Sequence, residues 1–252
     1  MSLLLDRGPA WTVTLDRPER ANALSADLVE RLHEVLDDAE RVRPLALVLR
    51  GGPRCFCAGF DLGGLDRETD GSLAFRFLRV GMLLERLAMA PYLTVAVVEG
   101  AAVGAGADLV AACDHRLAGP GATFRFPGAG FGVVLGTNRL AALTGGPGLV
   151  GGRPVLAGSA GGLVTGHPAA LADLLEGWSL TDPTARSALL AAARGTGQQQ
   201  DHALAALARS LAVPGLRDRL AGHASRWTAV RAVPTQGSTD RAITDHTTEE
   251  NA

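Results

Sequence analysis

The sequence predicts an α/β fold built around a parallel sheet. Two continuous apolar runs, Leu45–Leu49 and Thr94–Val98, are typical of strands that are buried on both faces. The segments Ala26–Arg41 and Leu73–Met89 instead carry apolar residues at the spacing of an amphipathic helix. Buried strands that alternate with such helices indicate β-α-β units and therefore a parallel sheet.

The boundaries of the first elements follow from local signals. Trp11–Leu15 alternates apolar and polar residues, which predicts a strand, and the sequence Asp16-Arg17-Pro18 ends it. Ser25 is a typical N-cap for the first helix, because its hydroxyl can accept a hydrogen bond from the first turn. Pro91 ends the second helix, since proline lacks the N–H that a helix interior requires.

The pattern changes after about residue 145. Gly145–Gly166 is rich in glycine and shows little periodicity. Short alanine- and leucine-rich helices are expected at Ala169–Trp178, Thr184–Arg194 and His202–Leu211. The polar composition of Val230–Ala252 predicts a disordered tail. We therefore expect a core over residues 1–165, a helical region over 166–229 and a tail over 230–252.

The bulk composition argues against several classes of function. The net charge of −2 gives no electrostatic case for binding nucleic acid or an anionic membrane. All 24 basic residues are arginine, so no lysine can act as a base or form a Schiff base. No apolar run reaches the ~18 residues of a membrane span. The apolar run near Met1 is too short for a signal peptide, so we expect a cytoplasmic protein.

The cysteines and histidines form no pattern typical of a metal site. Cys55, Cys57 and Cys113 lie in apolar contexts, which favours buried thiols over metal ligands. Their odd number fits a reducing cytosol. The six histidines show no ligand spacing, and His33 is expected on the surface of its helix. We therefore expect no bound metal.

Two segments of small residues are the most informative feature for function. Phe56–Leu62 and Gly100–Asp108 each follow a buried strand, and the second also opens a helix. Turns without bulky side chains can direct unpaired backbone N–H groups toward one point. An enzyme needs that arrangement to stabilise a negatively charged oxygen.

Four segments occur in an order that matches one known pattern. They are Thr14–Leu24, with its R-P-x-x-x-N-A-L signature, Val48–Leu62, with F-C-A-G-F-D-L, Val95–Asp114 and Gly136–Leu140. Together they resemble the crotonase family, also called the enoyl-CoA hydratase/isomerase superfamily. The resemblance covers roughly residues 10–143. It implies a crotonase-like spiral of β-β-α units with two stacked sheets and C-terminal helices, assembled as a homotrimer or a pair of trimers.

The resemblance also implies a chemistry. The family binds acyl-CoA thioesters, and two backbone N–H groups hold the thioester oxygen as it becomes an enolate. Those donors map onto Ala58 and Ala105, where alanine replaces a family glycine at position 105. Asp108 takes the place of the first catalytic glutamate and is shorter by one methylene group. CoA belongs to the substrate here, so no separate cofactor is expected.

Further substrate contacts are implied beside the two donors. Arg20 lies in the turn that the family places next to the CoA nucleotide, so it is either a phosphate contact or a solvated turn residue. The other implied contacts are Ala21, Gly59, Phe60, Asp61 and Leu62. Asp61 is better explained as a cap or turn residue than as a catalytic acid.

The chain departs from the family pattern in two places. The second glutamate of the hydratases would directly follow Pro127, where this sequence has Gly128. Hydration by a pair of glutamates is then hard to perform, whereas isomerisation and decarboxylation remain open. The family pattern after residue 145 is also hard to find, so the wall of the acyl pocket and the oligomer-forming helices are expected to be rebuilt.

Two hypotheses of different classes follow. The chain is an acyl-CoA enzyme of the hydratase/isomerase type, or it is a degenerate accessory protein that binds acyl-CoA or a partner enzyme, as in polyketide-type biosynthesis. Asp108 is correspondingly a catalytic base or a buried aspartate that shapes the pocket. A dinucleotide-binding loop at Gly100–Gly106 has the wrong spacing. A serine nucleophile at Ser159 lacks the first glycine of its motif.

Overall fold

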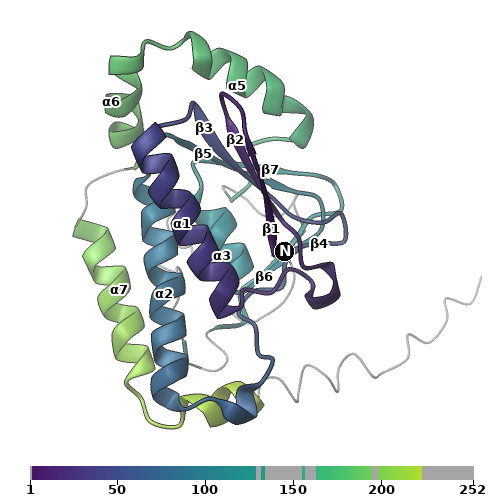
Figure 1. Cartoon of the computed structure of the whole chain (residues 1–252), viewed down its shortest axis with the longest axis vertical. Helices are drawn as coiled ribbons and strands as arrows, with labels where there is room; N and C mark the ends of the chain where they lie inside the picture. The colour runs from purple at the N-terminus through teal and green to yellow at the C-terminus, as the bar shows by residue number, and fades with distance from the viewer. Residues whose placement is uncertain (1, 129–131, 134–154, 157–162, 195–197, 223–252) are drawn as a thin grey trace, which may run out of the picture.

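The computed structural model describes residues 2–128, 132–133, 155–156, 163–194 and 198–222, which form two sheets with helices packed around them (Figure 1). The larger sheet has the strand order β1-β2-β3-β5-β7 and the smaller sheet has the order β4-β6-β8-β9. The strands of the larger sheet are β1 (Leu3–Arg7), β2 (Trp11–Leu15), β3 (Ala46–Arg50), β5 (Leu93–Val98) and β7 (His115–Ala118). Those of the smaller sheet are β4 (Cys55–Cys57), β6 (Ala101–Val103), β8 (Thr123–Arg125) and β9 (Val155–Leu156).

The chain alternates between the two sheets in a regular way. After α1 (Ala26–Val42), each strand of the larger sheet is followed by one of the smaller sheet: β3 by β4, β5 by β6 and β7 by β8. The helices α2 (Asp70–Met89) and α3 (Ala105–Ala112) connect successive pairs of strands. Strands β2, β3, β5 and β7 are parallel neighbours. The predicted spiral of β-β-α units is therefore confirmed.

The helices begin where side chains can cap them. The hydroxyl of Ser25 accepts a hydrogen bond from the Leu28 N–H at 3.2 Å, as the sequence predicts. The second helix begins at Asp70, three residues before the predicted start. A capping box explains the difference, because the Ser72 N–H donates to Thr69 Oγ1 while the Thr69 N–H donates to Ser72 Oγ.

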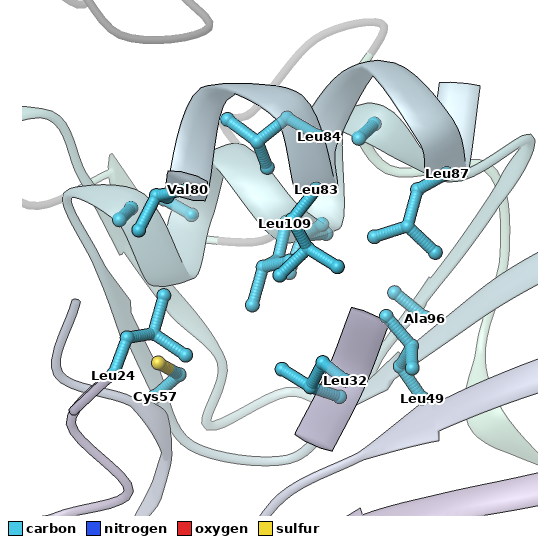
Figure 2. Close-up of a cluster of buried hydrophobic side chains, with 14 of the residues drawn as sticks. Leu24, Leu32, Leu49, Cys57, Val80, Leu83, Leu84, Leu87, Ala96 and Leu109 are labelled. Atoms are coloured by element: carbon cyan, nitrogen blue, oxygen red, sulfur yellow. The ribbon is translucent and has the colours of Figure 1, made fainter. Parts of the chain in front are cut away.

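The core is packed on both faces of the larger sheet. On one face, helices α1, α2 and α3 contribute Leu32, Leu83 and Leu109. These leucines lie in one cluster with side chains of the sheet such as Leu49 (Figure 2). Side chains of β5 alternate between the two faces, since Ala96 lies in this cluster whereas Val95 and Val97 belong to the cluster on the second face. Burial of both faces accounts for the continuous apolar run in the sequence.

The C-terminal helices complete this packing. They are α5 (Leu171–Leu180), α6 (Pro183–Arg194) and α7 (Gln198–Leu211), close to the three predicted segments. Leu174 and Leu190 pack on the second face of the larger sheet, and Trp178 donates a hydrogen bond from Nε1 to the Leu45 carbonyl at 3.1 Å. Helix α7 lies beside α2 (Figure 1). The carboxylate of Asp70 accepts hydrogen bonds from the backbone N–H groups of residues 215–217.

Several expectations need correction or lie outside the described residues. The two small-residue segments are not turns throughout, because each begins as a short strand, β4 or β6. Strands β1, β7, β8 and β9 were not predicted. The tail at 230–252 and most of Gly145–Gly166 lie outside the described residues, and the domain boundaries stay predictions.

Within the described residues, no helix combines the length and the apolar composition that crossing a membrane requires.

His33 is buried rather than exposed on its helix, with only 5% of its surface accessible. Its Nε2 lies 3.1 Å from the Arg79 carbonyl, and its Nδ1 lies 3.2 Å from the Arg86 guanidinium. Packing of α2 against α1 widens the buried stripe of α1 and so includes this position. Burial lowers the pKa of His33 below its ordinary value.

Because the folded protein disfavours protonated His33, the free energy of unfolding should fall as the pH drops from ~7.5 to ~5.5, across the ordinary histidine pKa of about 6.5. We expect this fall to be smaller in the His33→Gln variant, measured by urea unfolding at each pH. His167→Gln, at an exposed position, is the matched control and should behave like the unmodified protein. An identical pH dependence in all three proteins would contradict this role of His33.

Candidate active site

The Ala58 amide is already engaged in the fold. Its N–H donates to the Ala21 carbonyl at 2.9 Å. This hydrogen bond ties the turn after β2 to the end of β4. The structure therefore contradicts the expectation that Ala58 supplies an unpaired donor for a substrate oxygen.

The backbone N–H of Phe60, two residues after Ala58, points away from the neighbouring segment of the chain. The Leu24 N–H donates to the Gly59 carbonyl at 2.7 Å, and the Asp61 N–H donates to the Leu24 carbonyl at 3.1 Å. Because backbone groups alternate in direction along an extended strand, the Phe60 N–H is directed away from Leu24. Within the described part of the chain it donates no hydrogen bond.

Ala105 supplies a second unpaired amide at the start of α3. It is the first helical residue, preceded by Gly104 with a φ of 53°. The first N–H groups of a helix have no intrahelical acceptor. Among the described residues, the Ala105 N–H has no other acceptor either. The amide lies at the positive end of the helix dipole, which favours a negatively charged ligand.

Two glycines bring the segments that carry these amides into contact. A Cβ atom on Gly59 would lie 3.2 Å from the Ala105 nitrogen and would clash with the Val103 carbonyl. A Cβ atom on Gly106 would clash with the Cys57 carbonyl. Only glycine permits both close approaches. The peptide that joins Gly59 to Phe60 therefore lies beside the N-terminus of α3.

The carboxyl group of Asp108 lies one helical turn beyond Ala105. Asp108 is 5% exposed, and its Oδ1 has no hydrogen-bond partner among the described residues. Burial raises the pKa of Asp108 well above its ordinary value. The group is therefore a neutral acid over a range of pH in which exposed aspartates are charged.

No second acid is available from the segment that carries it in the family pattern. Gly128 occupies the position after Pro127, and a Cβ atom there would lie 2.8 Å from the Val133 carbonyl. After Asp114 the sequence has no aspartate or glutamate until Asp173. This long stretch therefore contributes no carboxylate, whatever its conformation.

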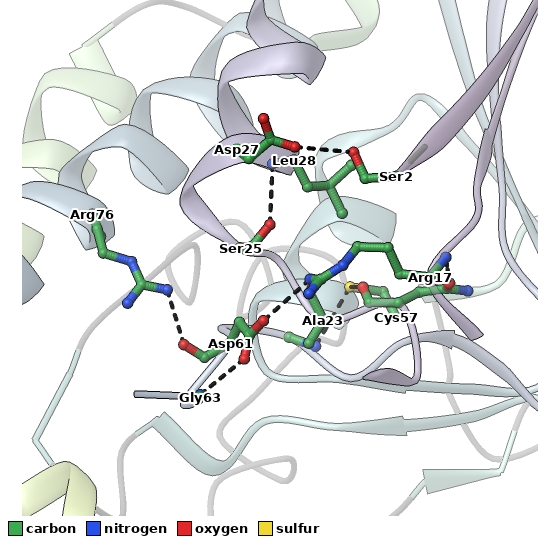
Figure 3. Close-up of polar contacts among 12 residues, drawn as sticks. Ser2, Arg17, Ala23, Ser25, Asp27, Leu28, Cys57, Asp61, Gly63 and Arg76 are labelled. Carbon is green, nitrogen blue, oxygen red and sulfur yellow. Dashed lines mark hydrogen bonds and ion pairs between the residues drawn. The ribbon is translucent and has the colours of Figure 1, made fainter. Parts of the chain in front are cut away.

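The Phe60 turn is held by two arginines that approach Asp61 from opposite sides (Figure 3). Arg76 donates to the Asp61 carbonyl at 2.9 Å, and its guanidinium lies 4.4 Å from the centroid of the Phe60 ring. That ring also stacks on Phe77, with centroids 3.9 Å apart. Arg17 forms an ion pair with the Asp61 carboxylate at 3.1 Å.

Asp61 itself has a structural environment. Besides the Arg17 pair, its Oδ1 accepts a hydrogen bond from the Gly63 N–H at 2.9 Å. These contacts fit a turn residue better than a catalytic acid. The adjacent Leu62 is half-buried against the core.

Asn22 is an anchoring residue that sequence reasoning did not single out. Its side chain donates to the carbonyls of Cys55 and Phe56, and its Oδ1 accepts from the Arg17 N–H at 2.8 Å. Its φ of 57° is left-handed, a conformation that asparagine tolerates better than most residues. That preference, at a fixed place in the R-P-x-x-x-N-A-L signature, was the available signal.

Arg20 remains available to a ligand. Its guanidinium lies against Gly63, and within the described residues it forms no ion pair. Ala21 beside it has a φ of 50° and uses its carbonyl to hold Ala58.

The Cys57 thiol is a poor nucleophile, and the cysteines belong to no metal-binding group among the described residues. Burial raises the pKa of Cys57 to about 12, and Cys113 is also buried. The described residues contain no group of three or more histidine, cysteine or acidic side chains that could hold a metal ion.

The raised pKa of Asp108 should appear in the stability of the protein. Between the unfolded pKa of about 3.9 and the higher folded value, the folded state binds more protons, so stability falls as pH rises. We expect Asp108→Asn to gain stability relative to the unmodified protein as pH increases from ~4 to ~8, because the amide cannot ionise. Urea unfolding across this range measures the difference.

Asp66→Asn, at an exposed position, is the matched control and should show a difference that changes little with pH. A constant offset between Asp108→Asn and the unmodified protein at every pH would show that the carboxyl group is not kept neutral by burial.

Comparison with known proteins identifies the family. The family model described as enoyl-CoA hydratase/isomerase matches residues 10–145, just over half of the chain. The protein named "Probable enoyl-CoA hydratase echA6" from Mycobacterium bovis is 37% identical over 137 residues, or 53% of this chain and 54% of that protein. The "Enoyl-CoA isomerase/hydratase fer4" from Mycosarcoma maydis is 33% identical over 137 residues, or 50% of each chain. The chain thus matches about half the length of these curated relatives.

A solved structure extends the similarity to most of the chain. It comes from Bordetella parapertussis and is described as a "putative enoyl-CoA hydratase/isomerase". It is 40% identical, with a TM-score of 0.84 over 89% of this chain and 99% of that one. Together with the family match, this similarity shows that the chain belongs to the enoyl-CoA hydratase/isomerase family.

Proposed function

We propose that the protein is an acyl-CoA-processing enzyme that stabilises a thioester enolate between the backbone N–H groups of Phe60 and Ala105. The observation that carries this proposal is the contact between two segments that each present an amide without an acceptor among the described residues. Phe60 rather than Ala58 supplies the first donor, because the Ala58 N–H already donates to the Ala21 carbonyl.

The proposed arrangement supplies the stabilisation that the chemistry needs. An enolate places negative charge on the thioester oxygen, and each preorganised donor in such a site contributes about 3 kcal/mol to the transition state. The positive end of α3 acts on the same charge. Asp108, one turn further along α3, is the group that exchanges a proton with the substrate.

The CoA portion of the substrate requires cationic contacts outside this site. Arg20 is the proposed phosphate contact, since its guanidinium is exposed and has no acidic partner among the described residues. Arg20 lies in the same turn as Ala21, whose carbonyl accepts the hydrogen bond from the Ala58 N–H. One short protein segment therefore joins the proposed contact for the nucleotide to the proposed site for the thioester.

The absence of a second acid at Gly128 also favours an alternative, in which the protein binds acyl-CoA or a partner enzyme without turning over a thioester. In that case it would serve as an accessory protein, for example in polyketide-type biosynthesis. Binding of acyl-CoA without stabilisation of an enolate would support this alternative.

A backbone amide can be tested by replacing its residue with proline. Ala105 is the first residue of α3, a position that tolerates proline because its N–H has no helical acceptor. Acetoacetyl-CoA, which ionises to an enolate that absorbs in the ultraviolet, is the probe. We expect the unmodified protein to increase the enolate fraction of the bound probe at fixed pH and Ala105→Pro to lose this effect by about 100-fold.

Ala105→Gly retains the N–H and is the matched control, expected to behave like the unmodified protein. If the unmodified protein binds acetoacetyl-CoA without increasing its enolate fraction, or if the proline variant stabilises the enolate equally well, the proposed donor pair is wrong.

Arg76 should act as a positioning residue for the Phe60 amide. In Arg76→Met, side-chain packing on the Phe60 ring can persist, while the cationic contact with that ring and the hydrogen bond to the Asp61 carbonyl are lost. The ion pair with Glu68 is lost as well. We expect kcat to fall about tenfold with a smaller change in KM, because small displacements of a catalytic group are costly. Arg79→Met is the matched control, since Arg79 lies on the same helix but pairs with Glu30. Equal effects of the two substitutions would refute this role.

A further inference from the structure

The site proposed above contains an acid but no base among the residues that the structure describes. Asp108 is buried, and its Oδ1 has no hydrogen-bond partner in the part of the chain that the structure describes. The nearby carboxylates of Asp61 and Glu68 are ion-paired with Arg17 and Arg76. The chain has no lysine, and it has no acidic residue between Asp114 and Asp173.

This composition restricts how an enolate can form. Removing a proton from the α-carbon of a thioester needs a group that can accept it. A neutral carboxyl group in an apolar environment is a donor instead. The enolate must then arise by loss of a group that takes no electrons with it, and carbon dioxide is the simplest such group.

We propose that the substrates are acyl-CoA thioesters that carry a carboxylate on the α-carbon, and that Asp108 delivers a proton to that carbon after carbon dioxide leaves. The proposal rests on the enolate site of Phe60 and Ala105 and specifies its substrate class.

The step balances without any further reactant. The bond between the α-carbon and the carboxylate breaks, and its electron pair forms the enolate, with the charge on the thioester oxygen. The O–H bond of Asp108 then breaks as a C–H bond forms at the α-carbon. Asp108 regains its proton from water, which is favoured because its charged form is buried. The net reaction consumes one proton and yields carbon dioxide and the decarboxylated thioester.

The charge state of the site also suits this substrate class. A permanently charged pair of carboxylates would repel the substrate carboxylate at short range. A single neutral Asp108 avoids that repulsion, and Gly128 adds no charge at the position of the second family acid. The burial of Asp108 and the glycine at position 128 therefore have one common consequence, which is a site without a fixed negative charge.

The test compares three probes with the full-length protein: methylmalonyl-CoA, crotonyl-CoA and a β,γ-enoyl-CoA. We expect release of carbon dioxide from methylmalonyl-CoA and no hydration or isomerisation of the other two. In D2O the propionyl-CoA formed should carry deuterium at the α-carbon in one configuration, as delivery from a fixed acid requires.

Asp108→Asn separates the role of the acid from that of the donors. We expect decarboxylation to slow by about 100-fold or more and the remaining product to lose its single configuration, whereas Asp108→Glu should recover both properties in part. Retained enolate stabilisation with acetoacetyl-CoA shows that the Asn variant is folded and that its amides are intact.

The outcomes distinguish the two proposals. Hydration of crotonyl-CoA or isomerisation of the β,γ-enoyl-CoA without release of carbon dioxide would overturn the substrate class but leave the enolate site standing. An unchanged rate and configuration in Asp108→Asn would overturn the role of Asp108. Failure of the unmodified protein to stabilise bound acetoacetyl-CoA as its enolate would instead remove the proposed function on which this inference rests.

Discussion

The close approach of two backbone segments is the constraint on which the proposed site depends. Gly59 lies against the start of α3, and Gly106 lies against the Cys57 carbonyl. A single methyl group at either glycine would collide with main-chain atoms, which cannot move without shifting a strand or a helix. The fold provides this contact because β4 and β6 are adjacent parallel strands of the smaller sheet, and the chain continues from each into one of the two segments.

Polar contacts fix the geometry that the glycines permit. Asn22 and Ala21 hold the end of β4 through its backbone. Arg17 and Arg76 hold the following turn through Asp61 (Figure 3). These contacts satisfy the carbonyls around the Phe60 amide, whose N–H has no acceptor among the described residues. A preorganised N–H without an intramolecular acceptor can donate to a ligand oxygen, which is the role that we propose for the Phe60 amide.

The sequence predicted the fold well, because its signals are local or periodic. Ser25 marks the start of α1, and the buried run over β5 reflects a sheet covered on both faces. For the proposed site, the sequence indicates the two segments but not the amide of the first segment that acts as a donor. Choosing between Ala58 and Phe60 depends on which amide bonds to Ala21 and which faces α3, and these are tertiary contacts that no local pattern encodes. His33 was misplaced for the same reason, since its burial depends on α2.

The central claim is that the main-chain N–H groups of Phe60 and Ala105 both donate hydrogen bonds to one thioester oxygen. A crystal structure with bound acetoacetyl-CoA tests it most directly. The account predicts that the thioester oxygen lies about 2.7–3.1 Å from both nitrogens, with the α-carbon facing Asp108. A thioester oxygen bound by other groups, or an Ala105 amide occupied by a protein acceptor in that complex, would contradict it.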